Sequence, residues 1–282
     1  MQMKIISNII ILSLLVFFTN GLTHAQNQNF RSRSSLGFMV GGSYYIGDLN
    51  QFGHFKNTNL SAGLLYRYHL NSRLELRGGL RYGKVEGHDS DSNDPYKQAR
   101  NLSFESQIFE VAAGLEFNYI NYKLGNDKYF FTPYMFIEMG VFKMDPRAEY
   151  NGEMVSLQSI GTEGQGSSLS DKNAYPLVQI AIPFGVGFKV NLGDRAALSI
   201  EYGIRKTFTD YLDDVGSGNF INKVELAEQN GNIAANLSDK SPDNINLSGG
   251  RGNSATKDWY SMFGVMFTFS LGNPDKCFYQ SR

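Results

Sequence analysis

Apolar and polar side chains alternate along this sequence with a period of two residues, and the pattern recurs in eight separate segments. It is clearest at residues 73–82, where one parity is charged: Arg73, Glu75, Arg77 and Arg81. The other parity is apolar: Leu74, Leu76, Leu80 and Tyr82. A period of two is that of a β-strand and not of a helix, so these segments are expected to be strands with one apolar and one polar face. The pattern fits a water-soluble β-sheet protein, and it equally fits a membrane β-barrel whose apolar face meets lipid.

The first 25 residues are a segment of a different kind. Lys4 precedes a mainly apolar run, 5–18, and Thr23-His24-Ala25 then places small residues where a signal peptidase cleaves. The run is too short for a comfortable membrane helix, so residues 1–25 are predicted to be a signal peptide that is removed on export. Residues 26–35 are polar and are predicted to be an N-terminal lead.

The eight predicted strands cover residues 37–47, 60–70, 73–82, 109–118, 135–141, 178–190, 197–205 and 263–271. Their connections alternate between long and short, which is typical of outer-membrane barrels with long external loops and short periplasmic turns. We predict an all-β, eight-stranded antiparallel up-and-down transmembrane β-barrel over residues 36–272 in the cell outer membrane, followed by a periplasmic tail, 273–282. The alternative is a soluble eight-stranded barrel such as a lipocalin, whose outward face would be polar. Pro183 cannot donate a ladder hydrogen bond, so a bulge or a local break is expected in the sixth strand.

If the polar parity faces inward, charged side chains of both signs collect in the barrel interior. These residues are Arg67, Arg73, Glu75, Arg77, Arg81, Glu110, Glu116, Glu138, Lys189, Glu201 and Arg205. Charges inside a low-dielectric wall have to be paired, and eight strands enclose a space that side chains can fill. We therefore expect an ion-pair network in a lumen too narrow to conduct, rather than an ion pathway.

Composition and residue spacing exclude several classes of function. The 26 Lys and Arg residues fall to 25 once Lys4 leaves with the signal peptide, against 27 Asp and Glu, which is no basis for nucleic-acid binding. The mature histidines, His54, His69 and His88, are scattered over a loop, a strand end and another loop. No catalytic triad or metal-ligand spacing emerges, so the chain is predicted to be no enzyme and to hold no cofactor or metal.

Two further groups of residues leave alternatives open. The acidic run Asp210, Asp213 and Asp214 offers oxygen ligands that suit calcium, but it lacks an EF-hand pattern, so we expect a solvated or arginine-paired loop. Cys277 is the single cysteine and forms no intramolecular disulfide. On an accessible periplasmic tail it is either a partner contact through an intermolecular disulfide or an inert thiol.

Five segments, in order along the chain, resemble those of one protein family. They are GGSYYIGDLN (41–50), RNLSFES (100–106), GTEGQG (161–166), IPFGVG (182–187) and RKTFTDYLDDV (205–215). With these segments the sequence resembles the PorG-like outer-membrane β-barrels associated with the type IX secretion system. The resemblance spans nearly all of the mature chain.

The resemblance implies a non-enzymatic scaffold in a protein secretion machine of the outer membrane. Its implied role is to anchor or position a periplasmic ring built from PorK-like lipoproteins and PorN-like proteins, so the expected partners are these proteins and outer-membrane lipid. Segments 161–166 and 209–215 fall on external loops in the predicted topology, where we expect a folded cap over the lumen. A stand-alone surface barrel for ligand binding or adhesion, and a small pore, are the alternatives.

Overall fold

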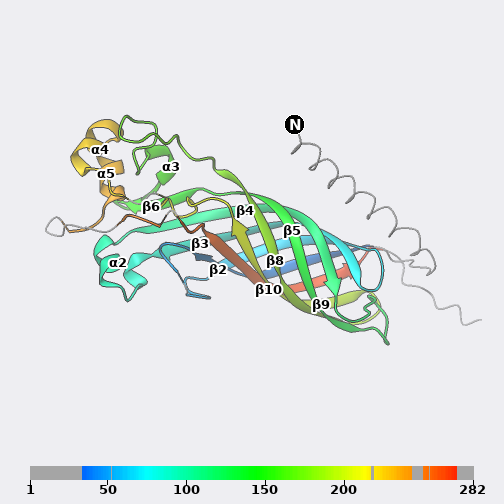
Figure 1. The fold of residues 1–282 in the computed structure, drawn as a ribbon. Coiled ribbons are helices and arrows are strands. Elements are labelled where there is room, and N and C mark those ends of the chain that lie inside the picture. Colours follow the sequence, from blue (N-terminus) through cyan, green and yellow to red (C-terminus); the bar gives the residue numbers. More distant parts are fainter. Residues whose placement is uncertain (1–33, 52, 217–218, 243–249, 254, 272–282) are drawn as a thin grey trace, which may run out of the picture.

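Each of the eight alternating segments forms a strand, and these strands pair into one antiparallel sheet that closes on itself (Figure 1). A computed structural model describes residues 34–51, 53–216, 219–242, 250–253 and 255–271. The predicted signal peptide, most of the N-terminal lead, the predicted tail and Cys277 lie outside these described residues.

The barrel strands are β1 (Ser34–Ile46), β2 (Asn59–His69), β3 (Leu74–His88), β4 (Ser103–Asn118), β5 (Phe131–Lys143), β8 (Val178–Asn191), β9 (Ala196–Thr207) and β10 (Trp259–Ser270). Each pairs antiparallel with the next barrel strand along the chain, and the pairing of β1 with β10 closes the cylinder. The predicted eight-stranded antiparallel up-and-down barrel is confirmed. Because the sheet closes, the barrel wall presents no unpaired strand edge.

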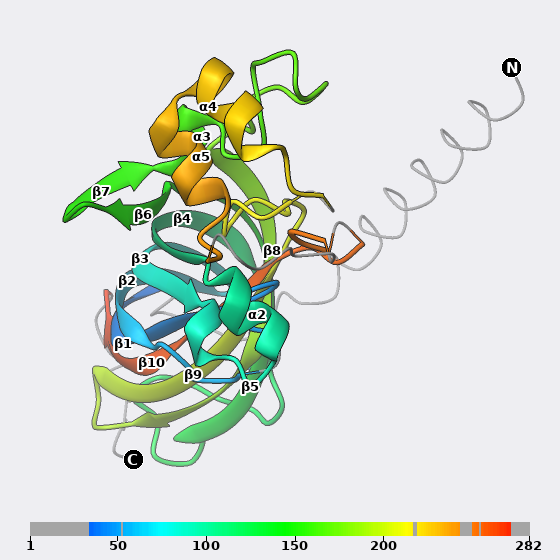
Figure 2. The same cartoon turned by 90° about the vertical axis from the view of Figure 1, so that its left-hand side faces the viewer.

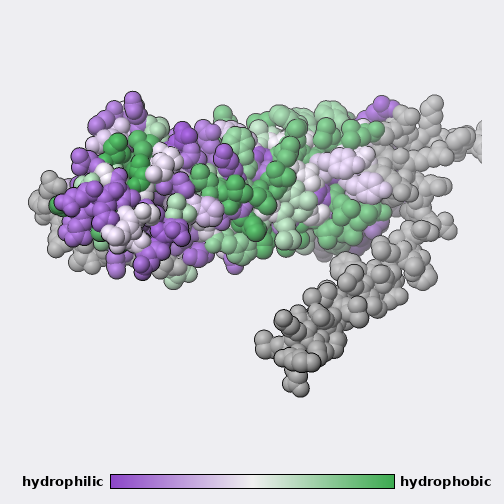
Figure 3. All heavy atoms as spheres, turned by 90° about the horizontal axis from the view of Figure 1, so that it is seen from above, coloured by the Kyte–Doolittle hydropathy of each residue, from purple (hydrophilic) through white to green (hydrophobic). Residues whose placement is uncertain are grey.

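The outward face of the barrel is an apolar belt, which appears as the green band in Figure 3. Side chains of the apolar parity are half exposed or more on strands all around the wall: Phe38, Leu80, Val111, Ile137, Val186, Ile200 and Phe267. An apolar surface of this extent is unusual for a protein surrounded by water. It is the pattern of a barrel whose outer wall meets hydrocarbon, so the polar outward face of a lipocalin-like soluble barrel is not what the structure has.

β3 and β4 extend further on the external side than predicted, pairing out to His88 and Ser103. The predicted boundaries at residues 82 and 109 were wrong because the alternation continues with its polarity reversed. Beyond the belt, Val85 and Phe104 point inward and are buried, whereas Lys84 is on the outer face. The external connection between β3 and β4 therefore runs from residue 89 to 102.

Most of the remaining secondary structure lies in the external loops. It consists of η1 (Asp89–Asp91), α2 (Pro95–Arg100), β6 (Pro146–Tyr150), β7 (Glu153–Ser156), α3 (Leu157–Ile160), α4 (Lys223–Asn230) and α5 (Asn232–Ser238). Figure 2 shows α3, α4, α5 and the β6–β7 hairpin grouped at one end of the barrel. Asn151 and Gly152 connect β6 to β7 with φ angles of 53° and 85°, as a two-residue hairpin turn requires. No helix in the described ranges is long and apolar enough to cross a membrane.

Pro183 causes a local break and no bulge. The β5–β8 pairing runs from Phe131↔Val190 to Ile137↔Phe184, stops, and resumes at Gly140↔Ala181 in the same register. On its other side β8 pairs with β9 without interruption through Pro183. Proline has no N–H to donate, and the wall accommodates it by losing ladder pairs between β8 and β5 while the pairing of β8 with β9 continues.

The orientation of the apolar face can be tested with one charge. Val186 lies in the belt and is 58% exposed, so Val186→Arg places a charge in hydrocarbon and should destabilise the barrel by about 2–4 kcal/mol in lipid vesicles. Val224 on α4 is 67% exposed outside the belt, and Val224→Arg should change the unfolding free energy by less than about 0.5 kcal/mol. Urea unfolding of both variants provides the comparison. Equal small effects would mean that the Val186 face meets water.

Candidate functional site: a filled lumen beneath a folded cap

Arg77 of β3 occupies the centre of the lumen and is fully buried in its side chain. Its guanidinium group contacts one carboxylate on each of three other strands: Glu116 of β4 at 2.9 Å, Glu138 of β5 at 3.0 Å and Glu201 of β9 at 2.9 Å. Its carbon atom Cζ also lies 4.0 Å from the centre of the Phe136 ring. A planar fork with five donors suits several carboxylates at once, so Arg77 ties four strands together across the barrel.

Toward the external end, a second group of charges surrounds Glu110. Arg81 contacts Glu110 at 2.8 Å and Glu138 at 2.9 Å, which links this group to Arg77. Arg205 approaches the other oxygen of Glu110 at 3.2 Å. The Tyr260 hydroxyl donates to that same oxygen at 2.7 Å. Both oxygens of the Glu110 carboxylate are therefore engaged by charged donors or a hydroxyl.

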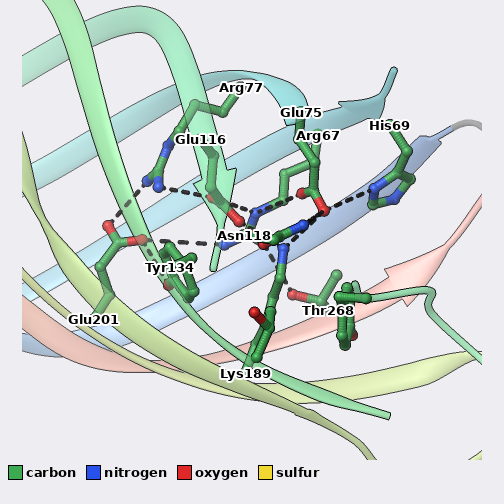
Figure 4. Close-up of polar contacts among 12 residues, drawn as sticks. Arg67, His69, Glu75, Arg77, Glu116, Asn118, Tyr134, Lys189, Glu201 and Thr268 are labelled. Carbon is green, nitrogen blue, oxygen red and sulfur yellow. Dashed lines mark hydrogen bonds and ion pairs between the residues drawn. The ribbon is translucent and has the colours of Figure 1, made fainter. Parts of the chain in front are cut away.

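Toward the periplasmic end, a third group of charges surrounds Lys189 (Figure 4). Its ammonium group contacts Glu75 at 2.8 Å and Glu116 at 2.7 Å. Arg67 reaches Glu116 at 2.9 Å, and His69 Nδ1 lies 3.1 Å from Glu75. Glu116 is shared with Arg77, so all three groups form one continuous network.

The network is balanced in charge and shielded from solvent. Its five cations are Arg67, Arg77, Arg81, Lys189 and Arg205. Its five anions are Glu75, Glu110, Glu116, Glu138 and Glu201. Each of these residues is at most 4% exposed. The five positive and five negative charges sum to zero, which is the condition under which so many ions can be buried without an uncompensated charge.

The structure brings ten of the eleven predicted lumen residues into this network, and the prediction for Arg73 was wrong. Arg73 precedes β3, which begins at Leu74, and its side chain is exposed in the periplasmic turn. There Nε of Arg73 donates to Oδ1 of Asn121 at 3.1 Å. Parity assigns a face only within a strand, so counting backward past the first ladder residue placed Arg73 on the wrong side.

Neutral polar residues complete the network and were not among the predicted site residues. Tyr134 donates to Glu201 at 2.9 Å, Asn118 donates to Glu75 at 2.9 Å, and Thr268 accepts from Arg67 at 3.2 Å. All of them occupy the inward parity of their strands, and this was the signal that could have identified them. They carry no charge, so the charge pattern of the strands does not reveal them.

An apolar plug closes the external end of the lumen. From the strands, inward side chains of Tyr45, Val85, Ile108, Phe142 and Met262 are buried in it. From the loops, it receives Leu49, Leu102, Leu157, Tyr175, Leu212, Val215 and Leu237. At the periplasmic end a cavity of about 10 Å³ remains beside Arg67, His69 and Lys189, which is about the size of one water molecule. The described lumen is therefore filled by side chains rather than open along its axis.

The external loops form a cap that is held by buried polar contacts. Arg251 pairs with Glu163 at 2.7 Å and with Asp214 at 3.5 Å, and the Glu163 carboxylate accepts from the backbone N–H of Gly216 at 3.1 Å. Tyr175 donates to Asp214 at 2.6 Å. Segments 161–166 and 209–215 thus lie against each other over the plug, as a folded cap.

The acidic run of the cap is divided among different partners. Asp214 belongs to the arginine-paired group, whereas Asp213 faces Asp258 across the hydroxyl of Tyr45, with oxygen distances of 2.6 and 2.9 Å. Asp210 lies 3.7 Å from Lys257. Within the described ranges, no three His, Cys, Asp or Glu side chains are grouped to hold a metal ion, so the calcium alternative has no ligand set there.

Burial raises the pKa of Asp213 well above 3.8, and repulsion from Asp258 and Asp48 raises it further. Burial likewise raises the pKa of Asp258, to which repulsion from Asp210 contributes. The Tyr45 hydroxyl carries one proton but contacts an oxygen of both carboxyl groups. Only one contact can use that proton, so the other is a hydrogen bond only if a carboxylic acid donates to the tyrosine oxygen. Geometry and electrostatics both indicate a protonated member in this pair.

Comparison with known proteins gives a family. The family described as "Domain of unknown function (DUF6089)" matches residues 8–281. No curated protein matches the sequence.

Similar solved structures include Ail, the attachment invasion locus protein of Yersinia pestis, in complex with the heparin analogue sucrose octasulfate, at 14% identity over 84% of this chain and 98% of that one, with a TM-score of 0.39. Neisserial surface protein A has 7% identity, coverage of 84% and 97%, and a TM-score of 0.41. The outer membrane protein OprG of Pseudomonas aeruginosa has 10% identity, coverage of 85% and 98%, and a TM-score of 0.35. Similarity at this level carries no argument about function, and the barrel assignment rests on the strand pairing.

Removing Arg77 should lower the unfolding free energy far more than removing Arg73. Arg77→Met leaves three carboxylates with less compensation in the lumen, so we expect a loss of about 3–5 kcal/mol in the unfolding free energy. Arg73→Met removes an exposed side chain in the turn and should change stability by less than about 1 kcal/mol. Urea unfolding in lipid vesicles measures both. A small effect of Arg77→Met would mean that its partner carboxyl groups are protonated or hydrated.

The cap should loosen as the pH rises. The pKa values of Asp213 and Asp258 are higher in the folded cap than the ordinary 3.8, so their stabilising contribution is complete below pH 3.8 and is lost as the pH rises through the raised values. Limited proteolysis of the external loops across this range should show faster cleavage at higher pH. Asp213→Asn should flatten this dependence, whereas Asp171→Asn, at an exposed loop position, should leave it unchanged. An unaltered profile in Asp213→Asn would assign the dependence to other groups.

Proposed function

The chain belongs to the family described as a domain of unknown function, DUF6089, and we propose that it is a non-enzymatic outer-membrane scaffold of the type IX secretion system that anchors or positions a periplasmic ring. The observation that carries the scaffold role is the filled lumen. Ion pairs cross it from wall to wall and an apolar plug covers its external end. A barrel of this kind acts through its outer surfaces, because its interior offers no path for a solute.

The outer-membrane location is supported by three features. The belt is apolar on every side of the cylinder, the wall has no free edge, and the sequence begins with a predicted signal peptide. The external loops are long and folded, whereas two of the three connections at the opposite end, around residues 70–73 and 192–195, are short. This asymmetry supports an orientation with the cap outside and the short turns in the periplasm.

The periplasmic face offers a preformed surface for a partner. The connection from residue 119 to 130 folds beneath the lumen, where Tyr122 is buried and donates to Asn191 at 2.6 Å. Its tip, Asp127 and Lys128, is exposed. The resemblance to PorG-like proteins supports PorK-like and PorN-like ring proteins as the partners of this face. Cys277, in the predicted tail, would be the residue available for a covalent contact.

A second candidate function is binding of an external ligand. It is favoured by the cap, whose loops are fixed by buried ion pairs such as Arg251–Glu163 and so present a defined surface outside the barrel. A small pore is disfavoured by the filled lumen. Conductance in planar bilayers would be expected to show no steady open state for the intact chain.

Charge reversals on opposite faces separate the two roles. Asp127→Lys combined with Lys128→Asp alters the exposed periplasmic tip without changing net charge, and it should reduce co-purification of PorK-like and PorN-like proteins and lower secretion. Glu225→Lys combined with Glu228→Lys alters exposed residues of α4 on the cap and should affect neither. Heat-dependent migration in gels verifies that both variants fold. The scaffold role would be contradicted if only the cap variant lost the ring proteins. It would also be contradicted if the ring proteins still co-purified with both variants and with a chain lacking residues 272–282.

A further inference from the structure

One side of the barrel has a polar crevice at the external border of the apolar belt. It forms where β4 exchanges its neighbour, since Phe109 pairs with Lys143 of β5 whereas Glu105 pairs with Arg147 of β6. No ladder pair forms between Phe109↔Lys143 and Ser106↔Pro146, and a crevice of about 210 Å³ lies beside this gap. Its lining consists of Glu105, Gln107, Phe109, Lys143, Met144, Asp145, Arg147 and Met154.

An apolar groove lies on the other side of Phe109, within the belt. It has a volume of about 370 Å³. Ala62 is a small residue in its lining, among larger outward side chains, and provides its floor. The larger side chains are Phe38, Leu64, Leu80, Tyr82, Phe109 and Val111. The Phe109 ring lies 4.8 Å from that of Tyr82 between centroids, so one pair of aromatic rings separates the groove from the crevice.

Charges in the crevice are paired except for one. Arg147 contacts Asp145 at 2.6 Å, and Lys84 contacts Glu105 and also lies 3.5 Å from Glu86. The Lys143 side chain is exposed and forms no ion pair or hydrogen bond with the described part of the chain. The crevice therefore presents one ammonium group that has no ion-pair partner in the described part of the chain, directly above exposed apolar wall and at the height where lipid head groups meet a membrane barrel.

We propose that this surface binds a membrane lipid whose head group bears a phosphate and a net negative charge, with an acyl chain in the groove and the phosphate at Lys143. The proposal rests on the outer-membrane placement and not on the secretion role. Two observations favour a lipid over a free anion or a protein partner. The apolar and polar recesses share Phe109, and their order along the barrel axis, apolar on the belt side and cationic on the external side, is that of an embedded lipid.

The chain contains a matched control for the lysine. Lys206 also points outward at the external end of a barrel strand, β9, where it pairs with Trp259. Its ammonium group lies 5.7 Å from the centre of the Trp259 ring. Neither of the two recesses is lined by Lys206. A general attraction of anionic lipid to the membrane border would involve both lysines, whereas the proposed site involves Lys143 alone.

The test measures lipid retained by the full chain in detergent micelles. Native mass spectrometry after exposure to lipid A should show one tightly held lipid. Lys143→Glu should weaken its retention by about fivefold or more, the effect of one lysine near an anionic head group. Ala62→Leu, which narrows the groove, should weaken it comparably, and Lys206→Glu should leave it unchanged. Gel migration with and without heating verifies that each variant folds.

Two competitors identify which part of the lipid is recognised. Inorganic phosphate at equal concentration should fail to displace lipid A, because it lacks an acyl chain, and phosphatidylcholine should displace it weakly because its head group has no net charge. Three results would overturn the proposal. They are displacement of lipid A by inorganic phosphate, an equal loss of bound lipid in Lys143→Glu and Lys206→Glu, and full retention of lipid in both Lys143→Glu and Ala62→Leu. If Val186→Arg also had no effect on stability, the membrane placement itself would fail, and the two failures are thereby distinguishable.

Discussion

The rest of this structure depends on charge neutralisation inside a wall that faces hydrocarbon. Arg77 lies near three carboxylates from three strands, and each is shared with, or close to, a second cation. An ion in such an interior is tolerated only when its partners satisfy it, and loss of one partner costs much more than the pair contributes. The network therefore specifies which strands lie opposite one another as well as filling the space between them.

The environment of each long strand changes along its length, and side-chain polarity follows it. Within the belt, β3 places Leu80 outside and Arg77 inside. Beyond the belt the same strand places Lys84 on the outer face and Val85 inside, where Val85 joins the plug. Water surrounds the external part and lipid the central part, so the buried face is apolar in one and ionic in the other. The plug is thus the hydrophobic core of a water-exposed domain, which the cap and the external ends of the strands build on the end of a membrane barrel.

A filled barrel with a folded cap limits the functions that the geometry supports. Transport along the axis would require the plug and the ion pairs to separate, whereas binding at a surface requires no rearrangement. Three surfaces are available: the cap, the periplasmic connection 119–130, and the wall with its groove and crevice. The scaffold proposal uses the second surface, and the lipid proposal uses the third. The first covers the buried pair Asp213 and Asp258, whose pKa values burial raises.

A period of two residues determined the strand number and the inward face that carries Glu110, Arg205 and the other charges, because alternation in a strand is a local property. The alternating long and short connections indicated the antiparallel order of the barrel. The period of two also assigned Arg73 wrongly, since local periodicity does not reveal where a ladder begins. The closed fold decided the rest. It determined which glutamate contacts which arginine, buried Asp213 beside Asp258, and packed loop residues such as Leu212 into the plug. These contacts join residues far apart in the chain, and their geometry exists only once the cylinder has brought the strands together.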